Sequence, residues 1–148
     1  MSLLTQRPRR LRANAAWRSM VAETSLSARD FVYPLFVIDG ENVVNPIASM
    51  PGVAQLSIDK LVEESRRAHA LGVPAVILFG IPDHKDPQGS PGYDPEGIVP
   101  RAIRELKKEI PTLLVWADVC LCEYTSHGHC GLLPAKGEVD NDTTLPLL

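Results

Sequence analysis

The three cysteines of the chain lie within eleven residues, in the segment DVCLCEYTSHGHC that runs from Asp118 to Cys130. They follow an apolar run with the spacing C-x-C-x7-C, and two of the four histidines stand close to the third cysteine. Alternate side chains of an extended strand share a face, so we expect Asp118, Cys120 and Cys122 to point the same way. Glycines on both sides of Cys130 would let the loop fold back toward the first two thiols. Three thiolates arranged in this way could bind one zinc ion and leave its fourth position open, as catalytic zinc sites do.

Two plainer interpretations compete with an open zinc site. The cysteines could be inert core residues, or they could form a closed structural site with His127 or His129 as the fourth ligand. The spacing alone does not decide between these interpretations and the open site. Asp118 adds a separate argument, because a carboxylate that is buried without a partner is costly and needs a metal, a cation or a catalytic role.

The composition is that of a globular protein and limits what the cysteines can do. The 148 residues are 45% hydrophobic and 22% charged, which suffices for one domain with a core. No apolar stretch approaches the roughly 20 residues that span a bilayer, and the N-terminus lacks the apolar segment of a secretory signal. We therefore expect a cytoplasmic protein with no membrane partner. An odd number of cysteines excludes a fully paired disulfide set within one chain, and in a reducing compartment metal binding is the better use of thiols.

The N-terminal segment is strongly basic. Five arginines precede the first acidic residue, Glu23, whereas all 18 acidic residues and the other ten basic residues lie from there onward. A basic arm on an acidic body could bind nucleic acid or pack on the acidic surface of a neighbouring subunit. Trp17 is the one aromatic side chain among the arginines, which gives little support to base stacking. We expect a subunit contact and no nucleic-acid partner.

Three apolar runs are typical of buried parallel strands, because both of their faces are apolar. They cover residues 31–38, 74–81 and 112–122. Two amphipathic helices are predicted between these runs. The first begins after Ser57, a favourable N-cap, and ends at Gly72; the second covers residues 98–109 and tolerates Pro100 in its first turn. The order β, α, β, α, β predicts a parallel sheet with right-handed crossovers.

Two architectures fit this order of elements. One is a small open α/β sheet, and the other is the beginning of a barrel with eight βα units. At about 40 residues per unit the chain holds about three units, so a barrel would be incomplete. Residues 81–97 form a long loop rich in Gly and Pro, and such loops at the carboxyl ends of parallel strands commonly carry the chemistry. Near the end of the chain, residues 140–142 could cap a further helix that opens at Thr143.

The segment DVCLCEYTSHGHCGLL, followed by GEVDND, resembles the zinc-binding segment of the delta-aminolevulinic acid dehydratases, also called porphobilinogen synthases. The resemblance extends to RPRRLR, ETSLSARDFVYPLFV, PIASMPGV, ILFGIPDHKD and GIVPRAIRELKKEIP, and so covers essentially the whole chain in order. It implies an enzyme that joins two molecules of 5-aminolevulinate into porphobilinogen with loss of water, on the route to haem and other tetrapyrroles.

The resemblance also implies a fold and an assembly. The fold is an α/β structure, a TIM (β/α)8 barrel, of which residues 29–148 would form about the first three βα units. Residues 1–28 would form an N-terminal arm that clasps a neighbouring subunit, commonly in a homo-octamer. Such a contact would account for the arginines of the arm.

The resemblance assigns roles to five residues of the cysteine segment. Cys120, Cys122 and Cys130 match the catalytic zinc ligands, Asp118 matches an active-site carboxylate, and His129 matches a ligand of a secondary zinc site. Members of the family run to roughly twice this length, as an eight-unit barrel requires, and their two Schiff-base lysines lie on later strands. We therefore expect this chain to be inactive alone. The alternatives are a non-catalytic assembly partner and a small zinc-binding module.

Overall fold

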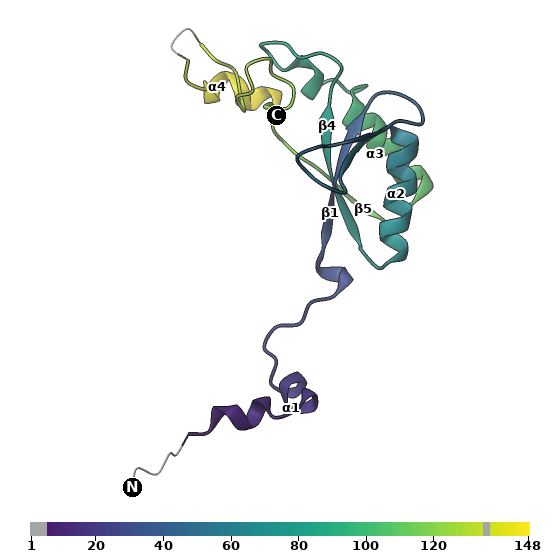
Figure 1. The fold of residues 1–148 in the computed structure, drawn as a ribbon. Coiled ribbons are helices and arrows are strands. Elements are labelled where there is room, and N and C mark those ends of the chain that lie inside the picture. The colour runs from purple at the N-terminus through teal and green to yellow at the C-terminus, as the bar shows by residue number, and fades with distance from the viewer. Residues whose placement is uncertain (1–5, 135–136) are drawn as a thin grey trace.

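The computed structural model describes residues 6–134 and 137–148 as an α/β structure built on a five-stranded sheet (Figure 1). The strands follow the order β2-β3-β1-β4-β5 across the sheet. Their bounds are Val32–Ile38 for β1, Val44–Pro46 for β2, Ala54–Leu56 for β3, Ala75–Ile81 for β4 and Leu114–Ala117 for β5. β1 pairs in parallel with β3 and β4, β4 pairs in parallel with β5, and β2 pairs antiparallel with β3. The predicted α/β class is confirmed, and the sheet is parallel as predicted except for the pairing of β2.

Two helices pack on the same face of this sheet, as Figure 1 shows. They are α2, Ile58–Ala70, and α3, Ile98–Glu109, which agree with the two predicted helices. Val37 and Leu78 of the sheet and Leu61 and Leu106 of the helices are fully buried between the two layers. Burial of one such side chain contributes about 1.5–3 kcal/mol, so this layer is the main source of stability. None of the described helices is long and apolar enough to cross a membrane.

The opposite face of the sheet carries no packed helix within the described part of the chain. Phe36 of β1 and Phe79 of β4 lie against each other there, with ring centroids 5.6 Å apart. Trp116 of β5 stands on the same face and leaves 52% of its surface exposed. Parallel sheets in proteins are almost always covered on both faces. This face is therefore a surface suited to further packing.

The strands β2 and β3 were not predicted. Each has only three residues, which is too short for the alternation of apolar and polar side chains to be recognised in the sequence. β3 adds to the edge of β1 only near its carboxyl end, where Phe36 pairs with Gln55 and Val37 with Leu56. Among the described residues, the first half of β1 therefore has no strand partner on this edge.

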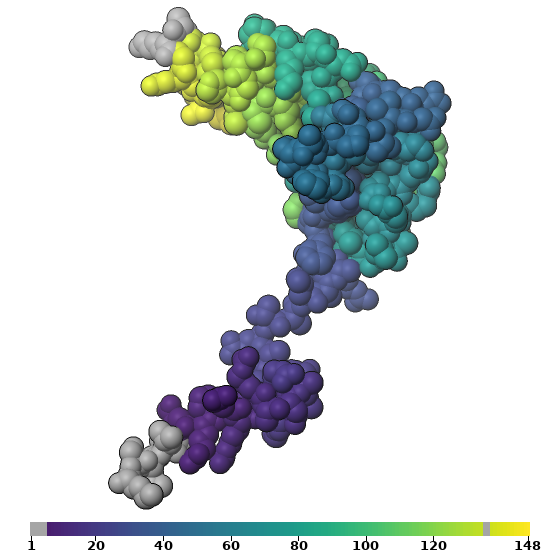
Figure 2. Space-filling model, in the orientation of Figure 1, coloured from purple at the N-terminus to yellow at the C-terminus, as the bar shows by residue number. Residues whose placement is uncertain are grey.

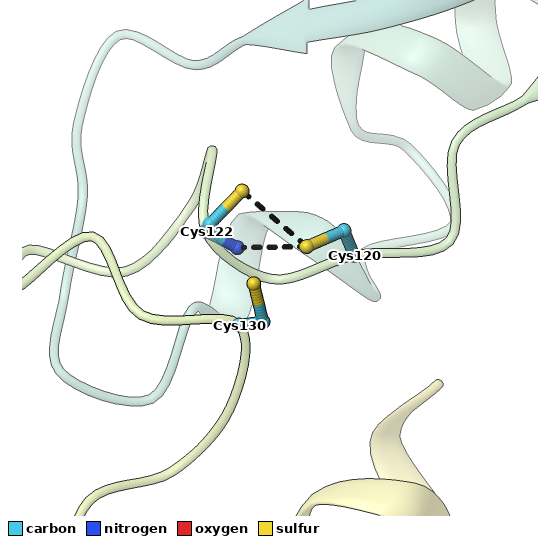
Figure 3. Close-up of side chains that lie close together, drawn as sticks. All are labelled: Cys120, Cys122 and Cys130. Atoms are coloured by element: carbon cyan, nitrogen blue, oxygen red, sulfur yellow. Dashed lines mark hydrogen bonds between the residues drawn. The ribbon is translucent and has the colours of Figure 1, made fainter. Parts of the chain in front are cut away.

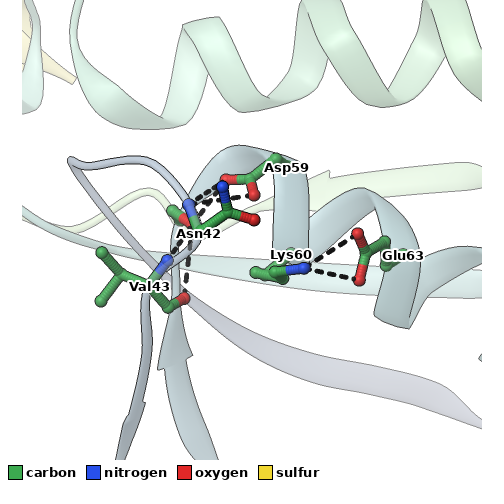
Figure 4. A network of polar contacts seen from close by, with 6 residues as sticks. Asn42, Val43, Asp59, Lys60 and Glu63 are labelled. Atoms are coloured by element: carbon green, nitrogen blue, oxygen red, sulfur yellow. Dashed lines mark hydrogen bonds and ion pairs between the residues drawn. The ribbon is translucent and has the colours of Figure 1, made fainter.

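A polar network ties the loop after β1 to the start of α2 (Figure 4). Ser57 precedes the helix as predicted, but its hydroxyl accepts a hydrogen bond from the amide of Val43 at 2.9 Å and caps no helical amide. The same hydroxyl donates to Oδ1 of Asp59 at 2.6 Å, and the amide of Asn42 donates to Oδ2 of Asp59 at 3.1 Å. The Ser57 hydrogen bond holds the pKa of the Asp59 carboxyl below its usual range, although partial burial opposes it; the Asn42 amide lowers the pKa further.

Residues 6–30 form an arm that projects away from the body of the molecule (Figures 1 and 2). It contains the short helices η1, Pro8–Arg12, α1, Ala15–Met20, and η2, Ala28–Asp30. The side chain of Asn14 caps α1 by accepting from the amide of Trp17 at 2.9 Å. None of the three helices has a buried residue, and Trp17 leaves 46% of its surface exposed. Side-chain caps hold α1 and η2, whereas η1 has none. Residues 1–5 of the predicted arm lie outside the described residues.

The last described α-helix, α4, Asn141–Thr144, begins two residues before the predicted start at Thr143. The side chain of Asp140 accepts hydrogen bonds from the amides of Asp142 at 3.0 Å and Thr143 at 3.3 Å. Asp140 is therefore the N-cap. The 3-10 helix η4, Leu145–Leu147, continues directly from α4.

We expect Asp59→Asn to lower the midpoint of thermal unfolding at pH 7. A carboxyl whose pKa is depressed in the folded state stabilises the fold above its unfolded pKa, about 3.9, and this stabilisation is lost as the pH falls through the folded pKa. The difference in midpoint between the wild-type chain and the variant should be present at about pH 5–7 and should shrink toward zero below about pH 3. Thermal melts followed by circular dichroism across this range measure it. Asp83→Asn, at an exposed position, is the control; a difference for Asp59→Asn that stays constant down to pH 3 would contradict the assignment.

Candidate metal centre

The three cysteines come together just beyond the carboxyl end of β5. Their sulfur atoms all lie within 4.8 Å of one another, and the Sγ atoms of Cys120 and Cys122 are 3.3 Å apart. Figure 3 shows Cys130 facing this pair from the returning loop. Ligands at about 2.3 Å from a tetrahedral zinc ion lie roughly 3.8 Å from one another. The three thiols therefore fit three corners of such a site with small adjustments.

The strand that precedes the cysteines is shorter than predicted. β5 ends at Ala117, and after the amide of Asp118, which bonds to the Leu78 carbonyl at 3.4 Å, the chain leaves the sheet. The carbonyl of Leu121 then accepts hydrogen bonds from the amides of Tyr124 and Thr125, both at 2.9 Å. The prediction that Asp118 and the first two cysteines share a strand face is wrong, because residues 118–125 form an irregular segment and a turn. The turn brings the thiols together instead.

Asp118 is exposed, so the argument from the cost of a buried, unpaired carboxylate does not apply to it. The segment that carries it has already left the sheet, and no described element covers the side chain. Asp118 nevertheless lines the same small pocket as Cys120, together with Gly92 and Tyr93. A molecule bound in this pocket would therefore lie beside both Asp118 and Cys120.

The two plainer interpretations of the cysteines do not agree with this geometry. Cys120 and Cys122 are half-buried and Cys130 is exposed, so they are not core residues. Within the described ranges, the cluster with ligand atoms close enough for a metal ion consists of these three cysteines alone, so neither histidine completes a Cys3His set. The rings of His127 and His129 instead lie beside each other, with centroids 5.5 Å apart, and Nε2 of His127 lies 3.2 Å from the carbonyl of Pro87.

Crowding gives the three thiols unequal acidities. Burial opposes ionisation of Cys120, but hydrogen bonds from the amide and thiol of Cys122 and from the thiol of Cys130 outweigh it, so the pKa of Cys120 is lowered. The hydrogen bond to Cys120, together with burial, raises the pKa of Cys122 to about 12. The pKa of Cys130 is also raised, first by its hydrogen bond to Cys120. One thiolate is favoured, and a bound cation would be needed to ionise all three near neutral pH.

Glu123 is a titratable group beside the thiols that the sequence did not single out. Burial raises its pKa to about 7, with a further contribution from the charge of Asp118, whereas Lys85 lowers it. Its Oε2 atom is buried and has no hydrogen-bond partner among the described residues. The sequence gives no sign that Glu123 is buried, because the residues around its side chain come from other segments.

The turn that carries the thiols is seated on β4 and the loop that follows it. Tyr124 is buried, with 6% of its surface exposed, and burial raises its pKa to about 12. Its ring packs against two glycines, Gly80 of β4 and Gly92 of the following loop. A Cβ atom at Gly80 would lie 2.6 Å from the Tyr124 hydroxyl oxygen and 2.6 Å from Cγ2 of Val99. The absence of a side chain at Gly80 is therefore what lets Tyr124 enter.

Comparison with known proteins tests the family resemblance that the cysteine segment indicates. A profile of the family described as delta-aminolevulinic acid dehydratase matches residues 5–148. The chain belongs to the delta-aminolevulinic acid dehydratase family. It is 52% identical over 147 residues to the delta-aminolevulinic acid dehydratase of Synechococcus elongatus and 50% identical over 146 residues to that of Halalkalibacterium halodurans. These alignments cover 97% and 99% of the chain but 45% and 44% of the relatives, so the chain spans less than half of their length.

A solved structure of the family shares the fold described above. It is the crystal structure of delta-aminolevulinic acid dehydratase (porphobilinogen synthase) from Toxoplasma gondii in complex with the reaction product porphobilinogen. The two structures superpose with a TM-score of 0.94 at 39% sequence identity, over 98% of this chain and 42% of the other. The family resemblance drawn from the sequence motifs is confirmed.

We expect Gly80→Ala to destabilise this member of the dehydratase family by about 1–3 kcal/mol, the usual cost of overpacking. The added methyl group would push Tyr124 outward and displace the cysteine turn. Urea unfolding of the wild-type chain and the variant measures the loss. The double variant Gly80→Ala with Tyr124→Phe should recover part of it, because the hydroxyl oxygen is one of the two close contacts. Equal stability of the wild-type chain and Gly80→Ala would show that the turn is not seated in this way.

Proposed function

We propose that the protein to which this chain belongs is a porphobilinogen synthase, which condenses two molecules of 5-aminolevulinate to porphobilinogen with loss of water. One observation carries the proposal: a three-thiol cluster lies at the carboxyl end of a parallel strand in a chain that matches the dehydratase family over residues 5–148. Loops at the carboxyl ends of parallel strands are where α/β enzymes place their reacting groups. The product bound to the Toxoplasma gondii relative supports the same substrate class.

The metal that suits the cluster best is zinc. Thiolates are soft ligands, and three of them with an open fourth position are typical of a zinc site that binds a substrate or water. Cys120, Cys122 and Cys130 would hold the ion, which when bound could polarise a carbonyl group or lower the pKa of a water molecule. In this proposal Asp118, in the pocket beside Cys120, holds or transfers a proton on the bound substrate. His129, next to the ring of His127, is proposed as a ligand of a secondary zinc site.

The surfaces that the described chain leaves open support an incomplete barrel. The order β1, α2, β4, α3, β5, with three parallel strands and a helix between each successive pair, agrees with the repeating βα order of an eight-unit TIM barrel. The uncovered sheet face, with Phe36, Phe79 and Trp116, would then be the inner face of that barrel. We propose that residues 29–148 form about its first three βα units, with the rest supplied by the part of the relatives that this chain does not match.

The arm supports assembly with further copies of the protein. Residues 1–28 are assigned to it in this proposal, and its described helices expose Trp17 and Met20 on a segment with five arginines. Exposed apolar side chains of this size on a projecting segment favour burial against another molecule. A neighbouring subunit with an acidic surface would provide that contact, and a homo-octamer is the assembly that we propose.

The proposed reaction can be tested by joining this chain to the part of a full-length relative, such as the Synechococcus elongatus protein, that it does not match. We expect the chimaera to form porphobilinogen from 5-aminolevulinate, and Cys130→Ser in the chimaera to lower the rate by more than about 100-fold, since even partners of metal ligands are worth about 10- to 100-fold. Ser126→Ala, at an exposed position in the same loop, is the control and should leave the rate unchanged. An active Cys130→Ser chimaera would refute the assignment of the metal centre.

None of the described lysines lies in the buried setting that an imine-forming lysine usually needs; each pairs with a carboxylate, donates to carbonyl oxygens or lies exposed. Lys60 pairs with Glu63 at 3.0 Å and Lys108 with Glu105 at 2.8 Å. Lys107 donates to the carbonyl oxygens of Pro111 and Leu113 at 2.7 and 2.8 Å. Lys85 is exposed and close to the Glu123 carboxyl. Lys136 lies outside the described residues.

We therefore expect this chain alone to form no porphobilinogen and no imine with 5-aminolevulinate. Treatment with borohydride and 5-aminolevulinate, followed by mass spectrometry, should give no stoichiometric adduct on any lysine of the chain. The chimaera is the positive control, and its adduct should map to the segment contributed by the relative. A stoichiometric adduct on a lysine of this chain would contradict the expectation.

A further inference from the structure

One buried hydroxyl closes the loop between the second and third cysteines. Residues 123–129 must reverse direction to return Cys130 to the other thiols. Thr125 is buried, with 1% of its surface exposed. Its Oγ1 hydroxyl donates a hydrogen bond to the carbonyl oxygen of His129 at 2.8 Å. That carbonyl belongs to the same peptide group as the amide of Cys130. The hydrogen bond therefore constrains the point at which the third cysteine leaves the turn.

Thr125 is itself held on its other side by the loop after β4. It forms an isolated parallel bridge with Asp86. The amide of Asp86 donates to the carbonyl of Tyr124 at 3.3 Å, and the amide of Ser126 donates to the carbonyl of Asp86 at 2.9 Å. A Cβ atom at Gly89 would lie 3.1 Å from Cγ2 of Thr125, so the methyl group packs on the backbone of that loop. Thr125 cannot shift without breaking these contacts.

The loop that holds Thr125 is stiffened by the Asp86 side chain. Its Oδ1 atom accepts hydrogen bonds from the amides of Gln88 at 2.8 Å and Ser90 at 3.1 Å, and its Oδ2 atom accepts from the Ser90 hydroxyl. Hydrogen bonds to a carboxylate are stronger than those between neutral groups. A continuous set of contacts thus runs from β4 through Asp86 and Thr125 to the peptide group of Cys130.

We propose that Thr125 is a positioning residue of the metal centre, and that its hydroxyl sets whether Cys130 reaches the ion held by Cys120 and Cys122. The proposal rests on the proposed function, because it takes the three thiols to be metal ligands. Without the hydroxyl, the His129 carbonyl loses its donor and the third thiolate is no longer held near the other two. Groups that orient metal ligands contribute about 10- to 100-fold to metal affinity.

Cobalt titration of the 148-residue chain tests the proposal with a matched set of variants. Thr125→Val keeps the size and removes the hydroxyl, Thr125→Ser keeps the hydroxyl, and Cys130→Ser gives the two-thiolate reference. Thr112→Val makes the same change at an exposed threonine away from the cysteines. We expect Thr125→Val to bind cobalt about 10- to 100-fold more weakly, with thiolate charge-transfer absorption close to that of Cys130→Ser. Thr125→Ser and Thr112→Val should match the wild-type chain.

Hydrogen exchange of the metal-free chain, followed by mass spectrometry, tests whether the Thr125 hydroxyl holds the loop in the absence of the ion. In Thr125→Val, exchange should become faster in residues 123–131 and stay unchanged in α2 and α3.

Failure of the wild-type chain to bind cobalt would overturn the proposed metal centre alone. Exchange in Thr125→Val at the wild-type rate would overturn the role of Thr125 in holding the loop. Faster exchange with a wild-type cobalt spectrum would also overturn the proposal, because Thr125 would then support only the turn. If Thr125→Val fails to fold, Thr125→Ser decides, and weakened cobalt binding in that variant overturns the role of the hydroxyl.

Discussion

The packing of the parallel sheet on α2 and α3 is the interaction on which the rest of the structure depends. Val37, Val76 and Leu78 are fully buried beneath the two helices, so the strands have a fixed position and direction. Because β1, β4 and β5 are parallel, their carboxyl ends meet at one edge of the sheet, and the segments that follow β4 and β5 lie next to each other there. The bridge between Asp86 and Thr125 forms between those segments. The core thus positions the cysteine turn through these two segments.

The electrostatics of that turn favour a bound cation. Ionising all three thiols, whose sulfur atoms lie within 4.8 Å of one another, has a large free-energy cost because the thiolates repel each other. The pKa of Cys122 is accordingly raised to about 12, while that of Cys120 is lowered. A metal ion would reduce this conflict, because it would replace the thiol protons and offset most of the negative charge of the thiolates. Metal uptake by such a cluster releases protons and becomes weaker as the pH falls. The half-buried carboxyl of Glu123, whose pKa burial raises to about 7, carries less negative charge near neutral pH than an ordinary glutamate does.

Local patterns predicted most of the elements that build this frame. The apolar runs at residues 31–38 and 74–81 correspond to β1 and β4, and the helix predicted over residues 98–109 corresponds to α3. These elements were predictable because their hydrophobic periodicity and their capping or terminating residues lie within the segment itself. The third run was predicted to continue to Cys122 because it stays apolar, but β5 ends at Ala117, where its pairing with β4 ends. The extent of a strand depends on its partner, which the run itself does not specify.

The sequence by itself determined the α/β order, the spacing of the three cysteines and the family, because side-chain types and their intervals are properties of one segment. The tertiary structure alone decided how those cysteines meet. The chain leaves the sheet after β5, Leu121 is buried, and Tyr124 enters the space left by Gly80 and Gly92, residues more than 30 positions upstream. The exposure of Asp118, the burial of Glu123 and the hydrogen bond from Thr125 to His129 follow from that turn. The seating of that turn depends on residues distant in the chain, and for that reason no local pattern could reveal these features.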